Sequence, residues 1–151
     1  EFANQYLAYE TLSAPLRGFL DGLTAVHVSG KGATQKTRDE MMQRSSTGLK
    51  GDELTSRHPA VRTLPETGRK ALYVNTAHTS HFAGMSEEES QPILEFLYRH
   101  QVKAEFTCRF RWAEGSVAFW DNRCTQHNPI NDYHGFRRLM HRVTLAGDKP
   151  V

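Results

Sequence analysis

The densest group of chemically active side chains lies between Trp120 and His127. The stretch reads Trp-Asp-Asn-Arg-Cys-Thr-Gln-His, so it combines aromatic, carboxylate, amide, guanidinium, thiol and imidazole groups. A neutral imidazole is the commonest metal ligand in proteins, and His127 offers one. Because a surface or hydrogen-bonded histidine is the commoner case, residue type alone does not assign His127 to a metal.

Two arginines follow His127 at a spacing that suits anion binding. Arg138 and Arg142 lie in a stretch, Arg137 to Leu145, whose period-2 pattern predicts a strand. Four residues along a strand place both side chains on one face, about 13 Å apart. A guanidinium holds a carboxylate or sulfonate through two hydrogen bonds and stays charged when water is excluded. If this face looks inward, the two charges need anionic partners.

The spacing of His127, Arg138 and Arg142, within WDNRCTQH and RRLMHRVTLAGDKP, resembles the carboxyl-terminal motif of the taurine dioxygenase family of Fe(II)- and 2-oxoglutarate-dependent oxygenases (the TauD/TfdA type). The resemblance implies that His127 is the distal iron ligand. It also implies that Arg138 holds the far carboxylate of 2-oxoglutarate and that Arg142 holds the anionic group of the substrate.

Three other stretches are similar to the same family. They are HPAVRTLPETGRKALYVN at 58–75, the helix start MSEEES, and FTCRFRW at 106–112, so the resemblance covers nearly all of the chain apart from 29–57. The family position of His78 often carries an aromatic residue that lines the substrate pocket, which makes His78 a candidate substrate-binding residue; a loop histidine without a ligand is the alternative. No role is predicted for His27 or His58.

The resemblance exposes an incomplete iron site. Such oxygenases bind iron through two histidines and one carboxylate, and the family supplies one pair as His-X-Asp or His-X-Glu. None of the eight histidines of this sequence has Asp or Glu two positions later. In the family that pair lies upstream, so we expect residues 1–151 to be the carboxyl-terminal part of a single dioxygenase domain.

The implied fold is a double-stranded β-helix, or jelly roll, with flanking helices, an α+β and mostly β architecture. Local patterns predict two helices, one after Ser13 and one after Ser86, where Glu89 completes a capping box. A hairpin is predicted around the Pro65–Gly68 turn, with strands at 61–64 and 69–75. Further strands are predicted at 106–112 and 117–120. The polar stretch 29–57 is predicted to be a mobile loop or lid.

Composition narrows the class of protein. The chain has 151 residues, 38% of them hydrophobic, a mean hydropathy of −0.62 and a net charge of +2. No apolar run approaches the roughly 20 residues of a membrane helix, and the charge is too small for a nucleic-acid binder, so neither partner is expected. Two cysteines are too few for a secreted disulfide scaffold, which favours a cytoplasmic protein. A homo-oligomer is compatible with the sequence.

The resemblance implies an enzyme, a dioxygenase that uses Fe(II), 2-oxoglutarate and O2 to hydroxylate a small anionic substrate, with taurine or another sulfonate favoured. GRKALYVN, FTCRFRW and the thiol of Cys124 also resemble aryloxyalkanoate dioxygenases of the same superfamily. A non-catalytic anion-binding jelly-roll module is a second alternative. A zinc site built from His78-X-X-His81 and Cys124-X-X-His127 is a third.

Overall fold

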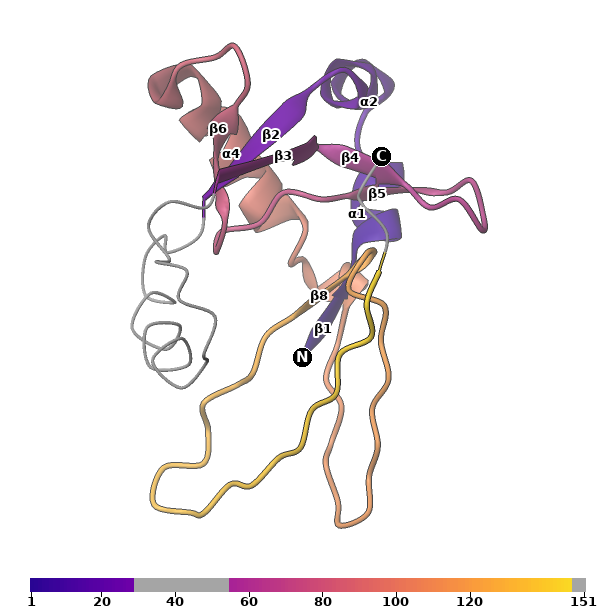
Figure 1. Cartoon of the computed structure of the whole chain (residues 1–151), viewed down its shortest axis with the longest axis vertical. Helices are drawn as coiled ribbons and strands as arrows, with labels where there is room; N and C mark the ends of the chain where they lie inside the picture. The colour runs from indigo at the N-terminus through magenta and orange to yellow at the C-terminus, as the bar shows by residue number, and fades with distance from the viewer. Residues whose placement is uncertain (29–54, 148–151) are drawn as a thin grey trace.

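The computed structural model describes residues 1–28 and 55–147 (Figure 1). In chain order its elements are β1 (Phe2–Asn4), α1 (Gln5–Glu10), α2 (Ala14–Asp21), β2 (Thr24–Val28), β3 (Thr55–Pro59), β4 (Val61–Thr63), β5 (Lys70–Leu72), β6 (Thr79–Phe82), α4 (Glu87–His100), the 3-10 helix η2 (Ala104–Phe106), β7 (Thr107–Cys108) and β8 (Thr125–His127). None of the described helices is long and apolar enough to cross a membrane.

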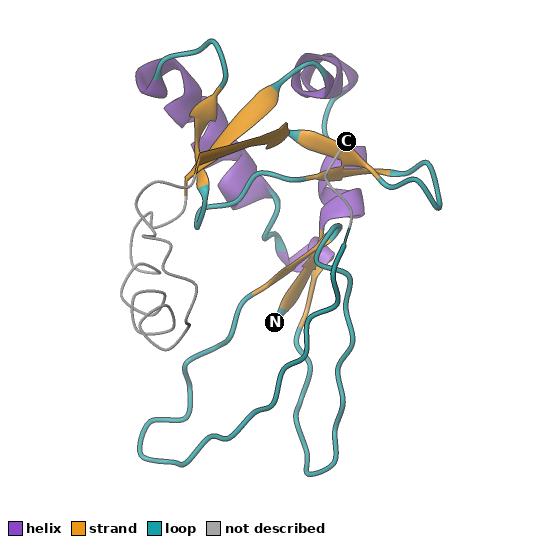
Figure 2. Ribbon diagram, in the orientation of Figure 1, coloured by secondary structure: helices purple, strands orange, loops and turns teal. Residues whose placement is uncertain are grey.

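The described strands form three small antiparallel sheets with helices packed beside them, which agrees with the expected mixture of β and α structure (Figure 2). One sheet has the order β7-β1-β8 and a second has the order β3-β2-β6. The third is the hairpin β4-β5. In Figure 1 the second and third sheets lie with the helices at one end of the molecule, and β1 and β8 lie below them.

The core lies where α4 packs against β6 and α1 packs against β5. Leu94 and Leu97 of α4 meet Phe82 of β6 and Leu20 of α2, and all four side chains are fully buried. Burial of a large apolar side chain contributes roughly 1.5–3 kcal/mol, so this cluster holds the helices on the sheets.

Both predicted helices are confirmed. Ser13 takes the N-cap position of α2, and Pro15 lies in the first turn, where its missing N–H is not needed. In α4 the capping box is present: the Glu89 N–H donates to Ser86 Oγ at 3.1 Å, and the Ser86 N–H donates to Glu89 Oε2 at 2.7 Å. Pro92 is accommodated inside the helix.

Replacing Ser86 by alanine tests this cap. The Glu89 N–H would lose its acceptor, and such a loss costs about 1 kcal/mol. We expect the free energy of unfolding, measured by urea denaturation, to fall by that amount. Glu88→Ala, in the same turn but outside the capping box, is the control. A Ser86→Ala variant as stable as the wild-type protein would show that the cap contributes nothing.

The predicted hairpin is also confirmed, with shorter strands than expected. Val61 pairs with Leu72 and Thr63 pairs with Lys70. Gly68 has a φ of +67°, a conformation that glycine adopts without steric cost, and its N–H donates to the Leu64 carbonyl at 2.8 Å. This turn fixes the end of the hairpin.

The strands predicted beyond residue 105 are wrong except at Thr107–Cys108. Residues 109–124 and 128–147 instead extend as two long loops on either side of β8 (Figure 1). A strand needs the backbone of a neighbour, and among the described residues no strand pairs with either of these two loops. The predicted strand 137–145 accordingly buries neither face.

Only the last three residues of the predicted lid, 29–57, lie among the described residues. Residues 29–54 lie outside the described residues, whereas Thr55, Ser56 and Arg57 belong to β3 and pair with β2. The carboxyl-terminal boundary of the predicted loop is therefore wrong. Residues 55–57 are all polar, so they lack the alternation of apolar and polar side chains that predicts a strand, and they form one because β2 provides the backbone partner.

Candidate functional site

His127 is held by β1, the central strand of its sheet. Phe2 pairs with His127 on one side and with Cys108 on the other. Two backbone hydrogen bonds flank this pairing: the Gln5 N–H donates to the Cys124 carbonyl and the Asn128 N–H donates to the Glu1 carbonyl, both at 2.9 Å. The backbone on both sides of His127 is thereby fixed.

The imidazole of His127 lies in an aromatic cluster. Its ring centroid is 5.0 Å from that of Phe2 and 4.8 Å from that of Trp120, and the last two rings are 4.9 Å apart. Trp120 is itself oriented by its indole N–H, which donates to Asn122 Oδ1 at 2.8 Å. Packing against two rings restricts how the imidazole can turn.

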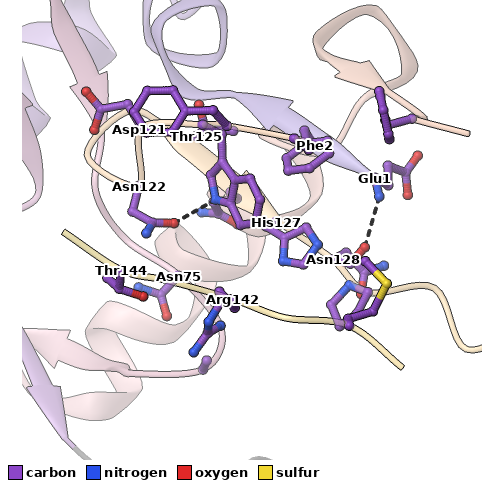
Figure 3. Close-up of a pocket in the computed structure, with 18 of the residues that line it drawn as sticks. Glu1, Phe2, Asn75, Asp121, Asn122, Thr125, His127, Asn128, Arg142 and Thr144 are labelled. Atoms are coloured by element: carbon purple, nitrogen blue, oxygen red, sulfur yellow. Dashed lines mark hydrogen bonds between the residues drawn. The ribbon is translucent and has the colours of Figure 1, made fainter. Parts of the chain in front are cut away.

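The four predicted site residues line one cavity. His127, Arg138, Arg142 and His78 all border a space of about 3240 Å³. Figure 3 shows His127 and Arg142 on facing segments of this cavity, with Asn75 near Arg142. Closed small-molecule sites measure roughly 300–1,000 Å³, so the described residues form an open trough. The arginines reach it from the loop 128–147, with Arg138 5.2 Å from the ring centroid of Tyr133.

The electrostatics of the trough favour a neutral imidazole at His127. Partial burial lowers the pKa of His127, and the positive charges of Arg142 and Arg138 lower it further. A neutral imidazole is the form that donates an electron pair to a metal. The same two arginines make the trough attractive to anions.

Another part of the cavity wall is a cluster of residues that the sequence analysis did not identify. The His27 ring is 5.2 Å from His58 and 6.0 Å from Tyr73, and the Arg62 guanidinium is 5.6 Å from the Tyr73 ring. The sequence signal for it is in HPAVRT and ALYVN, which supply His58, Arg62 and Tyr73. His78 stands beside this wall: its N–H donates to Asn75 Oδ1 at 2.9 Å, and its carbonyl accepts from the Val28 N–H at 2.8 Å.

His27 gives this wall a pH dependence. The residue is 7% exposed, and burial, followed by the charges of His58 and His78, lowers its pKa to about 4. The unfolded chain, with the ordinary value of about 6.5, binds a proton between pH 6.5 and 4 that the folded protein does not. Stability from His27 is therefore complete above pH 6.5 and is lost as the pH falls toward 4.

We expect about 2 kcal/mol of the free energy of unfolding to be lost through His27 between pH 7 and pH 5. His27→Leu should remove this part of the loss, whereas His134→Leu, at an exposed position, should not. Urea denaturation at the two pH values measures both. An unchanged difference between pH 7 and pH 5 in His27→Leu would contradict the assignment.

The described residues do not complete a metal centre. Within residues 1–28 and 55–147, no three His, Cys, Asp or Glu side chains converge closely enough to hold a metal. The predicted zinc alternative is therefore wrong, because His78, His81, Cys124 and His127 all lie in these ranges. An iron site of two histidines and a carboxylate does not fit this set either; His127 offers one donor.

Comparisons with known proteins agree with the motif. The model of the family described as "Taurine catabolism dioxygenase TauD, TfdA family" matches residues 1–144. An alpha-ketoglutarate-dependent sulfate ester dioxygenase of Pseudomonas putida is 36% identical over 153 residues, which cover 99% of this chain and 50% of that protein. Alpha-ketoglutarate is another name for 2-oxoglutarate.

Solved structures are also similar. A taurine dioxygenase from Burkholderia xenovorans is 42% identical with a TM-score of 0.65, covering 82% of this chain and 38% of that one. A candidate alpha-ketoglutarate-dependent 2,4-D dioxygenase from the same organism is 28% identical with a TM-score of 0.61, covering 82% and 46%. The chain spans half or less of the length of these proteins. It belongs to the taurine catabolism dioxygenase TauD, TfdA family.

Proposed function

We propose that the protein carrying this chain is an Fe(II)- and 2-oxoglutarate-dependent dioxygenase of small anionic substrates. The observation that carries the proposal is that His127, at the end of β8, and Arg138 and Arg142, in the loop that follows it, border one cavity. Overall, the reaction converts a C–H bond of the substrate to C–OH, while 2-oxoglutarate and O2 become succinate and CO2.

In this proposal each of the three residues has a separate role. His127 is one iron ligand, and its neutral imidazole suits that role. Arg138 binds the far carboxylate of 2-oxoglutarate, and Arg142 binds the anionic group of the substrate. The other two iron ligands come from residues outside the described part of the protein, which would complete a jelly roll around the trough. The chain would then be the carboxyl-terminal part of that domain.

A sulfonate or sulfate ester is the proposed substrate class. The guanidinium of Arg142 does not distinguish sulfonate from carboxylate, since both accept two parallel hydrogen bonds. The comparisons do favour one class: identity is 42% to the taurine dioxygenase and 28% to the candidate 2,4-D dioxygenase. His78, on the cavity border beside Asn75, is the proposed side chain at the substrate.

The test is succinate formation by the protein that carries this chain, supplied with Fe(II), 2-oxoglutarate and O2. Taurine, an alkyl sulfate and 2,4-D are offered in parallel. We expect Fe(II)-dependent succinate with the sulfonate or the sulfate ester, and less with 2,4-D. Binding of 2-oxoglutarate without metal, together with no succinate from any substrate, would instead identify a non-catalytic anion-binding module. The absence of a three-ligand group among the described residues would be consistent with that outcome.

A further inference from the structure

The Arg123 guanidinium connects two segments that are distant in the sequence. Its Nε donates to both carboxylate oxygens of Asp121 at 3.0 Å, and its Nη2 donates to Asp121 Oδ2 at 2.9 Å. Its Nη1 donates to Glu66 Oε1 at 2.7 Å. Glu66 belongs to the turn between β4 and β5, whereas Asp121 and Arg123 form the turn that leads into β8. We call these three residues the Asp121–Arg123–Glu66 clamp.

A fourth charged residue, Arg62, interacts electrostatically with Asp121 of the clamp. Arg62 of β4 is 2% exposed, and among the described residues it forms no ion pair within contact distance. Its positive charge, after the hydrogen bond from Arg123, is among the causes that lower the pKa of Asp121. Positive and negative charges therefore alternate in the order Arg62, Asp121, Arg123, Glu66. Removing Asp121 would leave the buried Arg62 guanidinium without this negative charge.

The clamp acts on the segment that presents His127. The Arg123 N–H donates to Asp121 Oδ1 at 2.8 Å, and the Cys124 N–H donates to the Asp121 carbonyl at 3.3 Å. From Cys124 the chain enters β8, where Gln126 Nε2 donates to the Val74 carbonyl, just after β5, at 3.0 Å. The turn before His127 is thus attached to the β4–β5 hairpin through Glu66, and β8 is attached through Gln126 to the segment just after β5. Both attachments lie outside the sheet that contains His127.

We propose that Glu66, acting through Arg123, is a positioning residue for His127. Its role is to hold the turn 121–124 against the β4–β5 hairpin so that β8 presents the imidazole to the cavity at a fixed place. The functional consequence of this inference rests on the proposed function, in which His127 is an iron ligand. Partners that contact a metal ligand directly typically change metal affinity or activity by about 10- to 100-fold when removed. Glu66 acts on His127 only through Arg123 and the turn, so its removal should have a smaller effect.

Hydrogen exchange in the metal-free protein tests the clamp directly. In Glu66→Ala we expect the amides of Arg123 and Cys124 to exchange about 3- to 10-fold faster, because exposed ion pairs are weak and only one of the three partners is lost. Arg123→Lys keeps the positive charge but loses the planar set of N–H donors that binds Asp121 and Glu66 together. This variant should give a larger increase in the exchange rate of these amides. Glu66 is 55% exposed, so its replacement leaves the core intact.

Glu10→Ala is the matched control. Glu10 is also a surface glutamate, 41% exposed, and it pairs with Arg69 at 2.7 Å. Among the described residues, Glu10 makes no hydrogen bond or ion pair with residues 121–124. We expect no change in exchange at Arg123 and Cys124 in this variant. Equal exchange in Glu66→Ala and the wild-type protein would overturn the inference, as would the same increase in Glu10→Ala.

A second measurement separates this inference from the proposed function. Mn(II) binding by the full protein should weaken several-fold in Glu66→Ala and stay unchanged in Glu10→Ala. Faster exchange without weaker Mn(II) binding would overturn the positioning role. If the wild-type protein forms no succinate, the proposed function fails, while the exchange result still decides whether the clamp holds the turn.

Discussion

Replacing His127 by alanine is expected to lower Fe(II)-dependent succinate formation by more than about 100-fold, beyond the usual effect of losing a residue that only orients a ligand. Among the described residues that line the cavity, His127 is the proposed metal ligand. Its loss should also weaken Mn(II) binding to the same protein. Both effects follow if His127 contacts the metal, since alanine has no group that replaces the donated electron pair.

His134→Ala is the control for this result. His134 is exposed and lies outside the cavity lining, so its removal should change neither Mn(II) binding nor succinate formation. The melting temperature of both variants shows whether either change unfolds the protein. A folded His127→Ala variant that binds Mn(II) as the wild-type protein does would remove His127 from the metal site.

Replacing Arg138 and replacing Arg142 should each raise a different Michaelis constant. In Arg138→Ala we expect the KM for 2-oxoglutarate to rise at least about 30-fold. In the complete site the bound carboxylate would enclose this guanidinium, and truncating one partner of an enclosed charge pair costs about 2–5 kcal/mol. In Arg142→Ala the KM for the sulfonate or sulfate ester should rise by a similar factor, with the KM for 2-oxoglutarate nearly unchanged. Steady-state kinetics with each compound varied in turn measure the separation.

Arg137→Ala is the matched control, because Arg137 also borders the cavity and adjoins Arg138 in the sequence. Its removal lowers the positive charge of the trough by the same amount but removes neither proposed anion site. If all three variants raised both KM values equally, the arginines would attract anions only through their summed charge. That result would contradict the separate assignments of Arg138 and Arg142.

The parts of the fold that sequence predicted correctly are those determined by nearby residues. Ser86 and Glu89 are three residues apart and cap α4 by themselves. Likewise, the Pro65–Gly68 turn brings β4 and β5 together because Gly68 adopts a positive φ. Such signals need no knowledge of the rest of the molecule.

Most of the strands predicted beyond residue 105 do not form, because an alternation of apolar and polar side chains does not by itself provide a backbone partner. The stretch 137–145 has the period of a strand, yet in the described part of the chain no strand lies paired with it. Conversely, β3 has little alternation and forms a strand because β2 lies beside it. Pairing is a property of the assembled fold.

The site was predicted in part for the same reason. The shared cavity of His127, Arg138 and Arg142 followed from a motif within 16 residues of sequence. The bond between Arg123 and Glu66 joins residues 57 positions apart, and the wall of His27, His58 and Tyr73 comes from separate strands and from the segment after β5. Nothing in the sequence near either residue of such a pair identifies the other.

The central claim is that metal and 2-oxoglutarate meet at His127 and Arg138. Anaerobic addition of 2-oxoglutarate to the Fe(II)-loaded protein tests it most directly, because a 2-oxo acid chelated to Fe(II) gives a visible charge-transfer band. We predict that the band appears in the wild-type protein, is absent in His127→Ala and requires far more 2-oxoglutarate in Arg138→Ala. No band in the wild-type protein, or one that titrates identically in Arg138→Ala, would contradict the claim.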